Sequence, residues 1–465
     1  MTAVDRAKPF CIAKREVWEA YKQVKANRGA AGVDGQSIED FDRDLSKNLY
    51  RIWNRMSSGS YFPPPVRRVD IPKGDTGQTR PLGIPTVSDR IAQMVVKRHL
   101  EPILEPLFHR DSYGYRPGKS AHDALVKARR RCWAHDWVLD LDIKSFFDEI
   151  DWDLLMKAVR RHTDCPWVLL YLERWLRAPV SLPDGALVGR ERGTPQGAVV
   201  SPVLANLFLH YAFDLWMQRE YPTIPFERYA DDAICHCASE AQALELRQAL
   251  ERRFADCQLR LHPQKTKVVY CKDANRPGTY PERSFDFLGY TFRSRVASGR
   301  SRKRFVSFIP AVSDGAAKRM RQEVRRWRLH LRSDLELEEI AKWVRPTLAG
   351  WVRYYGRFYP SQLRGELRTI DAFIVRWVSR KYKRFRGRTL ACWGWLRSLR
   401  RRNPNLFAHW ALEPTAGGWE PDESGGSRPV LGERGAEMPR ATRLSARVRN
   451  RLGAACRTDV VDQLL

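Results

Sequence analysis

Two periods of apolar residues run along this chain, and the change from one to the other marks the elements that we expect. Helical spacing prevails in residues 15 to 60, from about 88 to 108 and from 120 to 133. Three consecutive prolines, 63 to 65, end the first helical region, because proline removes a backbone donor and clashes with the preceding turn. Residues 66 to 71 are extended and are expected to lead into a hairpin.

A strand is predicted at residues 137 to 143, where apolar and polar residues alternate. Side chains on a strand change faces with period two, so Asp140 and Asp142 project from the same face. Apolar residues return to helical spacing from Ser201 onward. We expect this helix to pack beneath a hairpin that contains residues 229 to 232.

The centre of that hairpin holds two adjacent carboxylates, Asp231 and Asp232, in a predicted tight turn between two strands. Like charges at such a tip repel each other, and a divalent metal relieves the repulsion. Acidic residues are also ordinary in solvated turns, and Asp142 can simply end an edge strand. A two-metal site takes ligands from separate strands, and Asp142 with the two adjacent carboxylates supplies such a set, with Asp140 a weaker candidate. The chemistry indicated is metal-assisted phosphoryl transfer.

Further short motifs accompany these carboxylates in a fixed order. They are residues 29 to 35, Ile71-Pro72-Lys73, residues 80 to 85, Tyr113-Gly114-Tyr115-Arg116-Pro117, Gly193-Thr194-Pro195-Gln196-Gly197, Ser201-Pro202, Tyr229-Ala230-Asp231-Asp232, residues 261 to 266 and Phe287-Leu288-Gly289-Tyr290. Each is weak alone, but in this order they resemble the blocks of a reverse transcriptase encoded by a group II intron. The resemblance covers about residues 15 to 410.

The resemblance implies an α+β fold of the right-hand polymerase type, with fingers, a palm containing an antiparallel sheet, and a helical thumb or maturase domain. The expected divisions are an N-terminal extension with fingers at 1–136, a palm with finger insertions at 137–292, and the thumb or maturase RNA-binding domain at 293–410. Residues 348 to 355 resemble the family's thumb and indicate a three-helix unit. Residues 411–465 are expected to form a flexible, Pro/Gly-rich and basic tail.

The family's metal site maps onto four positions of this sequence: Asp142, Ile143, Asp231 and Asp232. It implies two Mg²⁺ ions, with Mn²⁺ as a substitute. Asp142 and Asp231 would each bind both ions, and Asp232 would be a nearby ligand or an electrostatic support. The ions would activate a primer 3′-hydroxyl and stabilise the departing pyrophosphate.

Six residues match positions that contact the incoming deoxynucleotide in the family: Lys73, Arg80, Ile143, Phe147, Gln196 and Lys265. Lys73 and Arg80 would hold the triphosphate, although ordinary surface charges on a hairpin would look the same. The ring of Phe147 would lie beneath the sugar and exclude a 2′-hydroxyl, unless it is a core residue like its neighbour Phe146. Lys265 would protonate the leaving pyrophosphate or, in the plainer interpretation, be a solvated cap.

The charge of the chain favours nucleic acid as the partner. Lys and Arg number 82 against 54 acidic residues, which gives a formal net charge of +28. Basic residues past Arg293 are interleaved with aromatic ones, a combination that binds phosphates and unpaired bases. We predict RNA contacts for Arg325, Arg326 and Arg328, with a solvated helix face as the alternative. The resemblance implies that Phe287, Leu288, Gly289 and Tyr290 grip the primer.

A membrane partner and a thiolate metal site are not expected. No stretch approaches about 18 uninterrupted apolar residues, and the N-terminus lacks a signal-peptide apolar core. The nine cysteines are scattered without a Cys-x-x-Cys pair, which fits a reducing cytosol. Cys235 and Cys237 favour core positions over metal binding. We expect a cytoplasmic protein associated with the nucleoid or with a ribonucleoprotein.

The expected function is that of an RNA-directed DNA polymerase that copies intron RNA into cDNA and assists splicing and mobility of its group II intron. Its partners would be intron RNA, an RNA template with a DNA primer, dNTPs and target DNA. One alternative is an RNA-binding splicing cofactor without polymerase activity, and another is a domesticated or defence-associated reverse transcriptase without a splicing role. No His/Cys cluster follows Trp410, so no endonuclease domain is expected.

Overall fold

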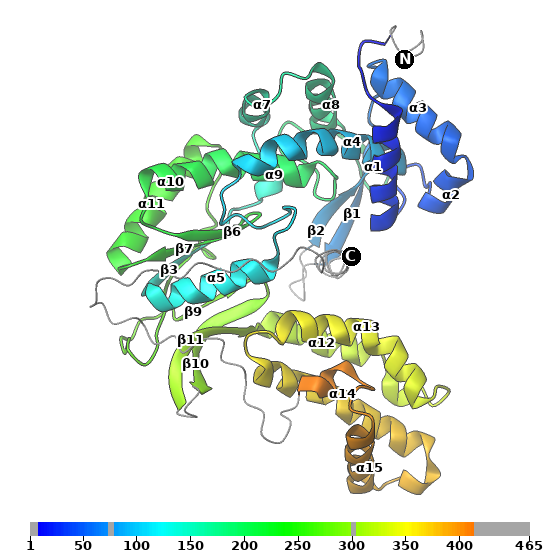
Figure 1. Ribbon diagram of the computed structural model, residues 1–465, viewed down its shortest axis with the longest axis vertical. Coiled ribbons are helices and arrows are strands. Elements are labelled where there is room, and N and C mark those ends of the chain that lie inside the picture. Colours follow the sequence, from blue (N-terminus) through cyan, green and yellow to red (C-terminus); the bar gives the residue numbers. More distant parts are fainter. Residues whose placement is uncertain (1–7, 73–78, 299–303, 413–465) are drawn as a thin grey trace, which may run out of the picture. The chain divides into compact units, whose positions relative to one another are not determined.

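The computed structural model describes residues 8–72, 79–298 and 304–412, which form two compact units (Figure 1). The first unit comprises Met1–Arg131 and His135–Val269 in their described parts, and the second comprises Cys132–Ala134 with the described part of Tyr270–Leu465. Lys73, a predicted nucleotide contact, lies outside the described residues. None of the helices in the described ranges is long and apolar enough to span a membrane.

The first unit begins with the predicted helical region, which the structure confirms. Its helices are α1 (Lys14–Asn27), α2 (Ile38–Arg43) and α3 (Leu45–Ser57). The side chain of Ser37 accepts from the amide of Asp40, and the carboxylate of Asp40 accepts from the amide of Ser37, so both groups cap the start of α2. Helix α1 packs against α4 (Val87–Leu104), which continues into η2 (Glu105–Leu107).

The predicted hairpin is also confirmed. Strands β1 (Val66–Pro72) and β2 (Thr79–Ile84) pair antiparallel, and the sheet continues from β1 through two short strands, β4 (Val180–Ser181) and β5 (Leu187–Val188). Helix α5 (Ala121–Ala134) belongs to this unit except for its last three residues. Further helices of the unit are α6 (Phe146–Glu149), α7 (Trp152–Arg160) and α8 (Pro166–Arg177).

A second sheet carries the predicted acidic positions. Its order is β6-β7-β3-β8, with bounds β3 (Trp137–Leu141), β6 (Phe226–Tyr229), β7 (Asp232–Cys237) and β8 (Lys267–Tyr270). Helix α11 (Glu240–Asp256) packs on β3 and β7, and Figure 1 shows α5 on the opposite side of these strands. Cys235 and Cys237 are buried in β7, as expected for core residues.

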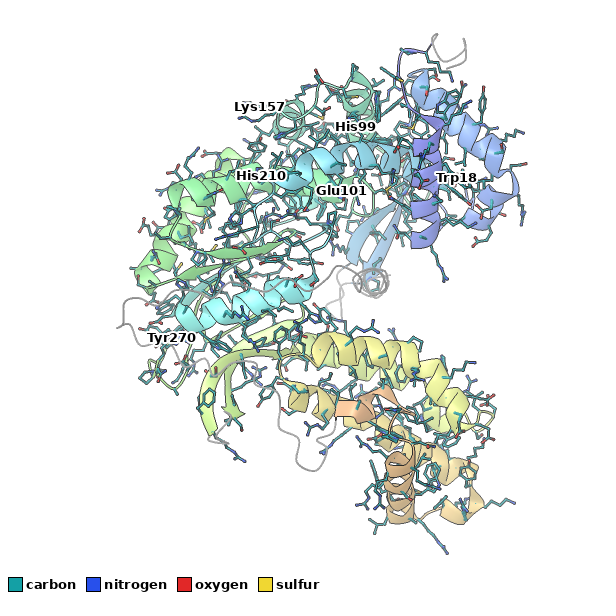
Figure 2. The ribbon with its side chains drawn as sticks, in the orientation of Figure 1. Trp18, His99, Glu101, Lys157, His210 and Tyr270 are labelled. Atoms are coloured by element: carbon teal, nitrogen blue, oxygen red, sulfur yellow. The ribbon has the colours of Figure 1, made fainter. Side chains whose placement is uncertain are left out.

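The helix predicted from Ser201 is confirmed as α9 (Ser201–Leu209), with Pro202 in its first turn. It continues through a π turn, η3 (His210–Asp214), into α10 (Leu215–Glu220). His210, labelled in Figure 2, opens this π turn. The periodicity does not indicate the extra residue that a π turn inserts, although such turns are frequent at functional sites.

The second unit combines a three-stranded sheet with a helical bundle. The sheet has the order β11-β10-β9, from β9 (Ser284–Phe287), β10 (Tyr290–Ser298) and β11 (Arg304–Val312). The division predicted at residue 293 therefore falls inside β10, which pairs with β11 over its whole length. The helices that follow are α12 (Asp314–Arg326), η4 (Leu329–Leu331), α13 (Leu337–Tyr355), α14 (Pro360–Lys381), η5 (Lys383–Phe385), α15 (Thr389–Arg402) and η6 (Ala408–Leu412).

The expected three-helix unit is thus wrong in number, because the described part of the bundle has four α-helices. The fourth, α15, buries Cys392, Leu396 and Leu399 in the same apolar core as α12, α13 and α14. Trp377 is fully buried in this core.

Candidate active site

The two adjacent carboxylates occupy a tight turn between β6 and β7. Tyr229 pairs with Asp232 in the antiparallel register, which leaves Ala230 and Asp231 as the connecting residues. Ala230 has a φ of 56°, a left-handed conformation that is uncommon for a residue with a side chain. Gly114 lies against this turn so closely that a Cβ atom there would be 2.3 Å from the Ala230 nitrogen. The turn is therefore strained and tightly packed, a combination frequent at functional sites.

The strand pairing of the β6-β7-β3-β8 sheet brings Asp142 to this turn. β3 pairs antiparallel with β7, ending with Leu141 opposite Ala233, and Asp142 is the next residue along the chain. One further step in the same register reaches Asp232, so the two carboxylates lie at the same end of neighbouring strands, which are about 4.8 Å apart. The carbonyl of Asp142 accepts a hydrogen bond of 2.7 Å from the His262 amide.

The carboxylates of the turn are harder to ionise than ordinary ones. Burial raises the pKa of Asp231, the negative charge of Asp142 raises it further, and Arg80 and Arg228 oppose the change. Part of Asp232 remains on the surface, but loss of hydration around its carboxyl group, together with the charges of Asp231 and Asp142, raises its pKa to about 7. Repulsion of this kind is what a bound cation removes.

The chemistry of the donor set fits a hard divalent cation, since it consists of carboxylates. In the described ranges, however, no three His, Cys, Asp or Glu side chains are gathered closely enough to hold an ion as they stand. Lys265 lies beside Asp142, with its Nζ 3.0 Å from Oδ2 of that carboxylate. Ile143 is buried and pairs with Leu261, through hydrogen bonds made by its neighbours Lys144 and Asp142, so its own carbonyl takes no part in that pairing.

Two of the residues predicted to contact the nucleotide, Arg80 and Gln196, are hydrogen-bonded to each other. Nε of Arg80 on β2 donates to Oε1 of Gln196 at 2.5 Å, although 116 residues separate them. The Gly83 amide donates to the carbonyl of Gln196 at 2.7 Å, and a Cβ on Gly197 would lie 2.6 Å from the Gly83 oxygen. The hairpin of β1 and β2 and the loop containing Gln196 are thus held together by hydrogen bonds, and glycine is required where their backbones touch.

The start of the loop that contains Gln196 is hydrogen-bonded to the segment after β3. The Thr194 amide donates to the carbonyl of Phe147 at 2.7 Å, and the Gly193 amide donates to that of Ile150 at the same distance. Phe146 and Phe147 are both buried, with ring centroids 5.4 Å apart in an edge-to-face contact. Both rings therefore pack in the core. The contact of Phe147 with the nucleotide sugar stays a prediction.

A buried carboxylate also supports the loop. Asp89 accepts hydrogen bonds from Tyr61, Trp175 and Gln93 at 2.7 to 2.9 Å, and Oε1 of Gln93 accepts from the Val199 amide at 2.8 Å. Burial raises the pKa of Asp89 to about 6, with all three donors opposing the change. No local pattern in the sequence indicates this arrangement, because its partners come from separate elements.

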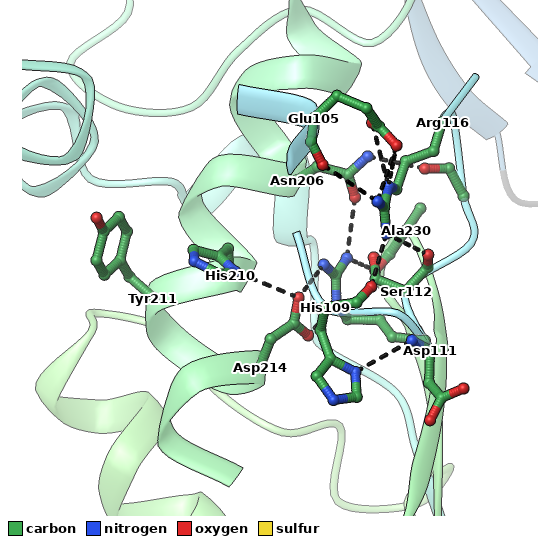
Figure 3. A network of polar contacts seen from close by, with 12 residues as sticks. Glu105, His109, Asp111, Ser112, Arg116, Asn206, His210, Tyr211, Asp214 and Ala230 are labelled. Carbon is green, nitrogen blue, oxygen red and sulfur yellow. Dashed lines mark hydrogen bonds and ion pairs between the residues drawn. The ribbon is translucent and has the colours of Figure 1, made fainter. Parts of the chain in front are cut away.

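The most extensive support behind the acidic turn comes from Arg228, which sequence reasoning missed. Figure 3 labels three residues that the Arg228 guanidinium contacts, Asn206, Asp214 and Ala230. This guanidinium is buried and donates to both oxygens of Asp214 at 2.7 and 2.6 Å, to Oδ1 of Asn206 at 3.0 Å and to the Ala230 carbonyl at 3.0 Å. Nδ2 of Asn206 in turn donates to the carbonyl of Gly114 at 2.8 Å. The helical run from Ser201 therefore does lie against the aspartate hairpin, as expected.

The π turn contributes to this network. It carries Asp214 at its end and His210 at its start, and burial lowers the pKa of His210 to about 4. A neutral imidazole leaves Asp214 with Arg228 as its cationic partner. An arginine in the strand before the turn was the available signal, since a buried guanidinium needs a carboxylate.

The remaining predicted residues lie in the second unit. Phe287 and Tyr290 are buried, whereas Leu288 and Gly289, which form the turn between β9 and β10, are partly exposed. All three RNA-binding candidates lie at the end of α12: Arg325 and Arg326 are its last two residues, and Arg328 follows it, each of them exposed. Arg326 lies 3.6 Å from Glu323, an exposed pair of little energetic weight.

Comparisons with known proteins agree with this geometry. The family described as "Reverse transcriptase (RNA-dependent DNA polymerase)" matches residues 71–292, and the family "Group II intron, maturase-specific domain" matches residues 317–393. Protein YkfC of Escherichia coli (strain K12) is 32% identical over 338 residues, which cover 63% of this chain and 84% of that protein. The chain belongs to the group II intron reverse transcriptase and maturase family.

Other relatives of this reverse transcriptase match over shorter segments. The "Group II intron-encoded protein LtrA" of Lactococcus lactis subsp. cremoris is 35% identical over 193 residues, or 41% of this chain and 32% of that protein. The "Putative COX1/OXI3 intron 1 protein" of Saccharomyces cerevisiae is 28% identical over 199 residues, 43% of this chain and 24% of that protein. The aligned part of the chain thus spans about a third or less of these two relatives.

The family match establishes the class of the enzyme. This maturase-type reverse transcriptase is an RNA-directed DNA polymerase, with the mixed helix and strand composition of the right-hand fold. Its two matched domains support reverse transcription linked to intron mobility and splicing assistance, over either alternative. The family depends on divalent metal and binds intron RNA and nucleic acid substrates.

Proposed function

We propose that the candidate active site joins deoxynucleotides to a primer by two-metal phosphoryl transfer, copying the intron RNA that the same protein helps to splice and mobilise. One observation carries this proposal. The pairing of β3 with β7 brings Asp142 beside the Asp231–Asp232 turn, where burial, together with their mutual charge, raises the pKa of both turn carboxyls. Carboxylates that repel one another at the ends of neighbouring strands form a site that a cation stabilises.

The metal ligands in this proposal are Asp142, Asp231, Asp232 and the carbonyl of Ile143, holding two Mg²⁺ ions with Mn²⁺ as a substitute. When bound, the ions would activate the primer 3′-hydroxyl and stabilise the departing pyrophosphate. Arg228 holds the turn in place from behind through the Ala230 carbonyl. Lys265 keeps Asp142 neutralised until substrate arrives, since its ammonium lies 3.0 Å from that carboxylate.

The nucleotide would be held from the fingers side. Arg80 supplies a guanidinium whose positive charge already acts on Asp231 and Asp232, and it suits a triphosphate because it donates several hydrogen bonds. Gln196 orients Arg80 through their 2.5 Å hydrogen bond and would contact the nucleotide or the template backbone. Lys73 would add a second cation. Phe147 would contact the deoxyribose, and Lys265 would move from Asp142 to protonate the pyrophosphate.

The second unit would hold the nucleic acids. Leu288 and Gly289, on a turn anchored by Phe287 and Tyr290, would contact the primer. The exposed guanidinium groups of Arg325, Arg326 and Arg328 would bind phosphates of intron RNA. With target DNA as a further substrate, the protein would act in the cytoplasm, at the nucleoid and within a ribonucleoprotein.

A primer-extension assay on poly(rA)/oligo(dT) with Mg²⁺ tests the polymerase proposal. We expect the full-length protein to extend the primer with dTTP, to stop when a chelator removes the metal, and to resume with Mg²⁺ or Mn²⁺. A folded protein that binds structured RNA tightly but extends no primer under any of these conditions would leave the splicing cofactor as the function.

A further inference from the structure

The turn proposed to grip the primer is built in a costly conformation. It joins β9 to β10, with Phe287 opposite Tyr290 in the register. Leu288 has a φ of 51° and Gly289 a φ of 77°, and two positive values at the centre of a hairpin are the type I′ pattern. Glycine adopts this conformation freely, but leucine does not. The turn therefore needs contacts that hold Leu288 in place.

Those contacts come from the last two residues of α13. The hydroxyl of Tyr354 donates to the carbonyl of Leu288 at 2.9 Å. The hydroxyl of Tyr355 lies behind Gly289, where an added Cβ atom would be 3.0 Å from it. The carbonyl of Gly289 accepts from the Ser313 amide at 2.9 Å, directly before α12. Both central residues of the turn are therefore fixed by the helical bundle.

The anchor residue of the hairpin faces the same helix end. Tyr290 is fully buried, its hydroxyl donates to the carbonyl of Tyr354, and its ring centroid lies 5.6, 5.4 and 5.3 Å from those of Tyr354, Tyr355 and Phe358. Burial raises the pKa of Tyr290 above its ordinary value, so this hydroxyl remains a donor. The hydroxyls of Tyr290 and Tyr354 thus each bind the backbone of the other segment, which makes the contact reciprocal.

The two partners of this contact belong to different matched domains. The turn lies within the reverse transcriptase match at 71–292, and Tyr354 and Tyr355 lie within the maturase match at 317–393. Nucleic-acid binding gives no reason for tyrosine hydroxyls that point at backbone carbonyls of a neighbouring turn. Setting the position of that turn does.

We propose that Tyr354 and Tyr355 are positioning residues for primer binding, so that the maturase helix α13 sets the place of the Leu288–Gly289 turn against the primer strand. This inference rests on the proposed primer contact of the turn. Loss of the Tyr354 hydroxyl releases the Leu288 carbonyl and lets the strained turn relax. The primer–template duplex would then bind less tightly, while chemistry at the saturated enzyme would continue.

The chain offers a closely matched control. The hydroxyl of Tyr359 also donates to a backbone carbonyl at 2.9 Å, but its acceptor is Val296, near the far end of β10. Tyr354→Phe and Tyr359→Phe therefore remove the same kind of hydrogen bond from the same hairpin region. The Tyr354 bond is partly buried and the Tyr359 bond is exposed, so thermal unfolding of both variants is measured beside the kinetics; only Tyr354→Phe affects the turn.

The test measures kcat and KM for a primer–template duplex in single-nucleotide extension by the full-length protein. We expect Tyr354→Phe to raise KM by about 3- to 10-fold, the effect expected from removing one hydrogen bond, with kcat within about twofold of wild type. Tyr359→Phe should leave both constants unchanged. Equal KM values for the two variants, or a fall in kcat alone for Tyr354→Phe, would overturn the positioning role.

A third variant separates this inference from the function on which it rests. Gly289→Ala strains the turn directly, because its φ of 77° disfavours any side chain and Tyr355 is close. If Gly289→Ala raises KM and Tyr354→Phe does not, the turn contacts the primer but α13 does not position it. If Gly289→Ala leaves KM unchanged, the primer contact itself is wrong, and a KM effect of Tyr354→Phe would then act through another route and also overturn the inference.

Discussion

Nζ of Lys265 lies 3.0 Å from Oδ2 of Asp142, so a residue expected to serve the leaving group neutralises a residue expected to bind metal. The pair joins the end of β3 to the loop before β8. Lys265 is half exposed, and the bond is therefore worth little to folding. The ion pair matters for function, because a metal ion that binds Asp142 must displace Lys265. The displaced ammonium is then free to donate a proton.

Replacing Lys265 by methionine should separate these two roles. Without the competing ammonium, we expect the Mg²⁺ concentration for half-maximal extension to fall a few-fold. Without the proton donor, kcat should fall on the order of 100-fold, the range of general acid catalysis. Steady-state extension across a Mg²⁺ series measures both values.

The exposed neighbour Lys144 provides the control, because Lys144→Met removes the same charge two residues from Asp142. We expect kcat near wild type for that variant. If Lys265→Met behaves like Lys144→Met, the plainer interpretation of Lys265 as a solvated cap is correct.

Metal binding should depend on pH through Asp232. The pKa of Asp232 is about 7 in the folded protein and near 4 in the unfolded chain. Between these two pH values the folded state therefore holds a proton that the unfolded chain has released. In metal-free protein, this carboxyl lowers stability as pH rises from about 4 through 7. Mg²⁺ must replace the same proton, so its apparent affinity should rise about tenfold between pH 6 and pH 8.

Thermal unfolding with a chelator and across a Mg²⁺ series at each pH checks this expectation. The stabilisation by Mg²⁺ should appear at lower concentration at pH 8 than at pH 6. Asp232→Asn removes this titrating proton and should bind Mg²⁺ with a smaller pH dependence than wild type over this range. A wild-type affinity that is the same at both pH values would show that Asp232 does not exchange its proton for metal.

Phe147→Val should relax the choice of sugar. A smaller side chain leaves room for a 2′-hydroxyl, and we expect the ratio of ribonucleotide to deoxynucleotide kcat/KM to rise by about tenfold or more. Phe146→Val is the matched control, since both rings are buried and in contact, and both variants should lose up to about 3 kcal/mol of stability. An equal ratio for the two variants would make Phe147 a core residue only.

Much of the fold was readable from local pattern. The hairpin of β1 and β2 follows from three prolines and an extended run, and the turn at Asp231 follows from two acidic residues between apolar strands. Helices α1 to α5 and α9 carry clear periodicity, and capping boxes at Ser37 and Ser120 mark two of their starts. These signals act over a few residues and need no tertiary context.

What escaped prediction depends on contacts between distant segments. Arg228 reads as an ordinary basic residue until the π turn presents Asp214 to it, and Asp89 reads as a helix-start residue until Tyr61 and Trp175 enclose it. The extra helix α15 was missed because its aromatic and basic residues were assigned to a nucleic-acid-binding surface, whereas packing against α14 makes it a core element. The pattern of residues along the chain does not indicate which distant residues come into contact.

Intron RNA binding should depend on the arginines at the end of α12. Replacing Arg325, Arg326 and Arg328 by alanine should reduce the slope of log K against log salt, by roughly one unit or less for each phosphate that is no longer neutralised. Extension on a short primer–template should change less than RNA affinity, because the catalytic carboxylates are untouched. Filter binding of structured RNA across a salt series measures the slope.

A triple variant elsewhere controls for total charge. Lys157, Arg161 and Arg252 are exposed in the first unit, and their replacement removes the same three charges. If both triple variants reduce the slope equally, the arginines of α12 contribute only to the overall charge and have no local role.

The central claim is that the Asp231–Asp232 turn is a metal-dependent polymerase centre, and Asp231→Asn tests it most directly. The substitution keeps size and shape but removes a charged ligand, so cDNA synthesis at saturating Mg²⁺ should fall to background, while Asp140→Asn on the neighbouring strand should retain extension. RNA affinity measured on the same preparation should stay close to wild type, because the exposed basic surface is unchanged. Substantial extension by Asp231→Asn, with RNA binding intact, would contradict the assignment of this turn as the catalytic centre.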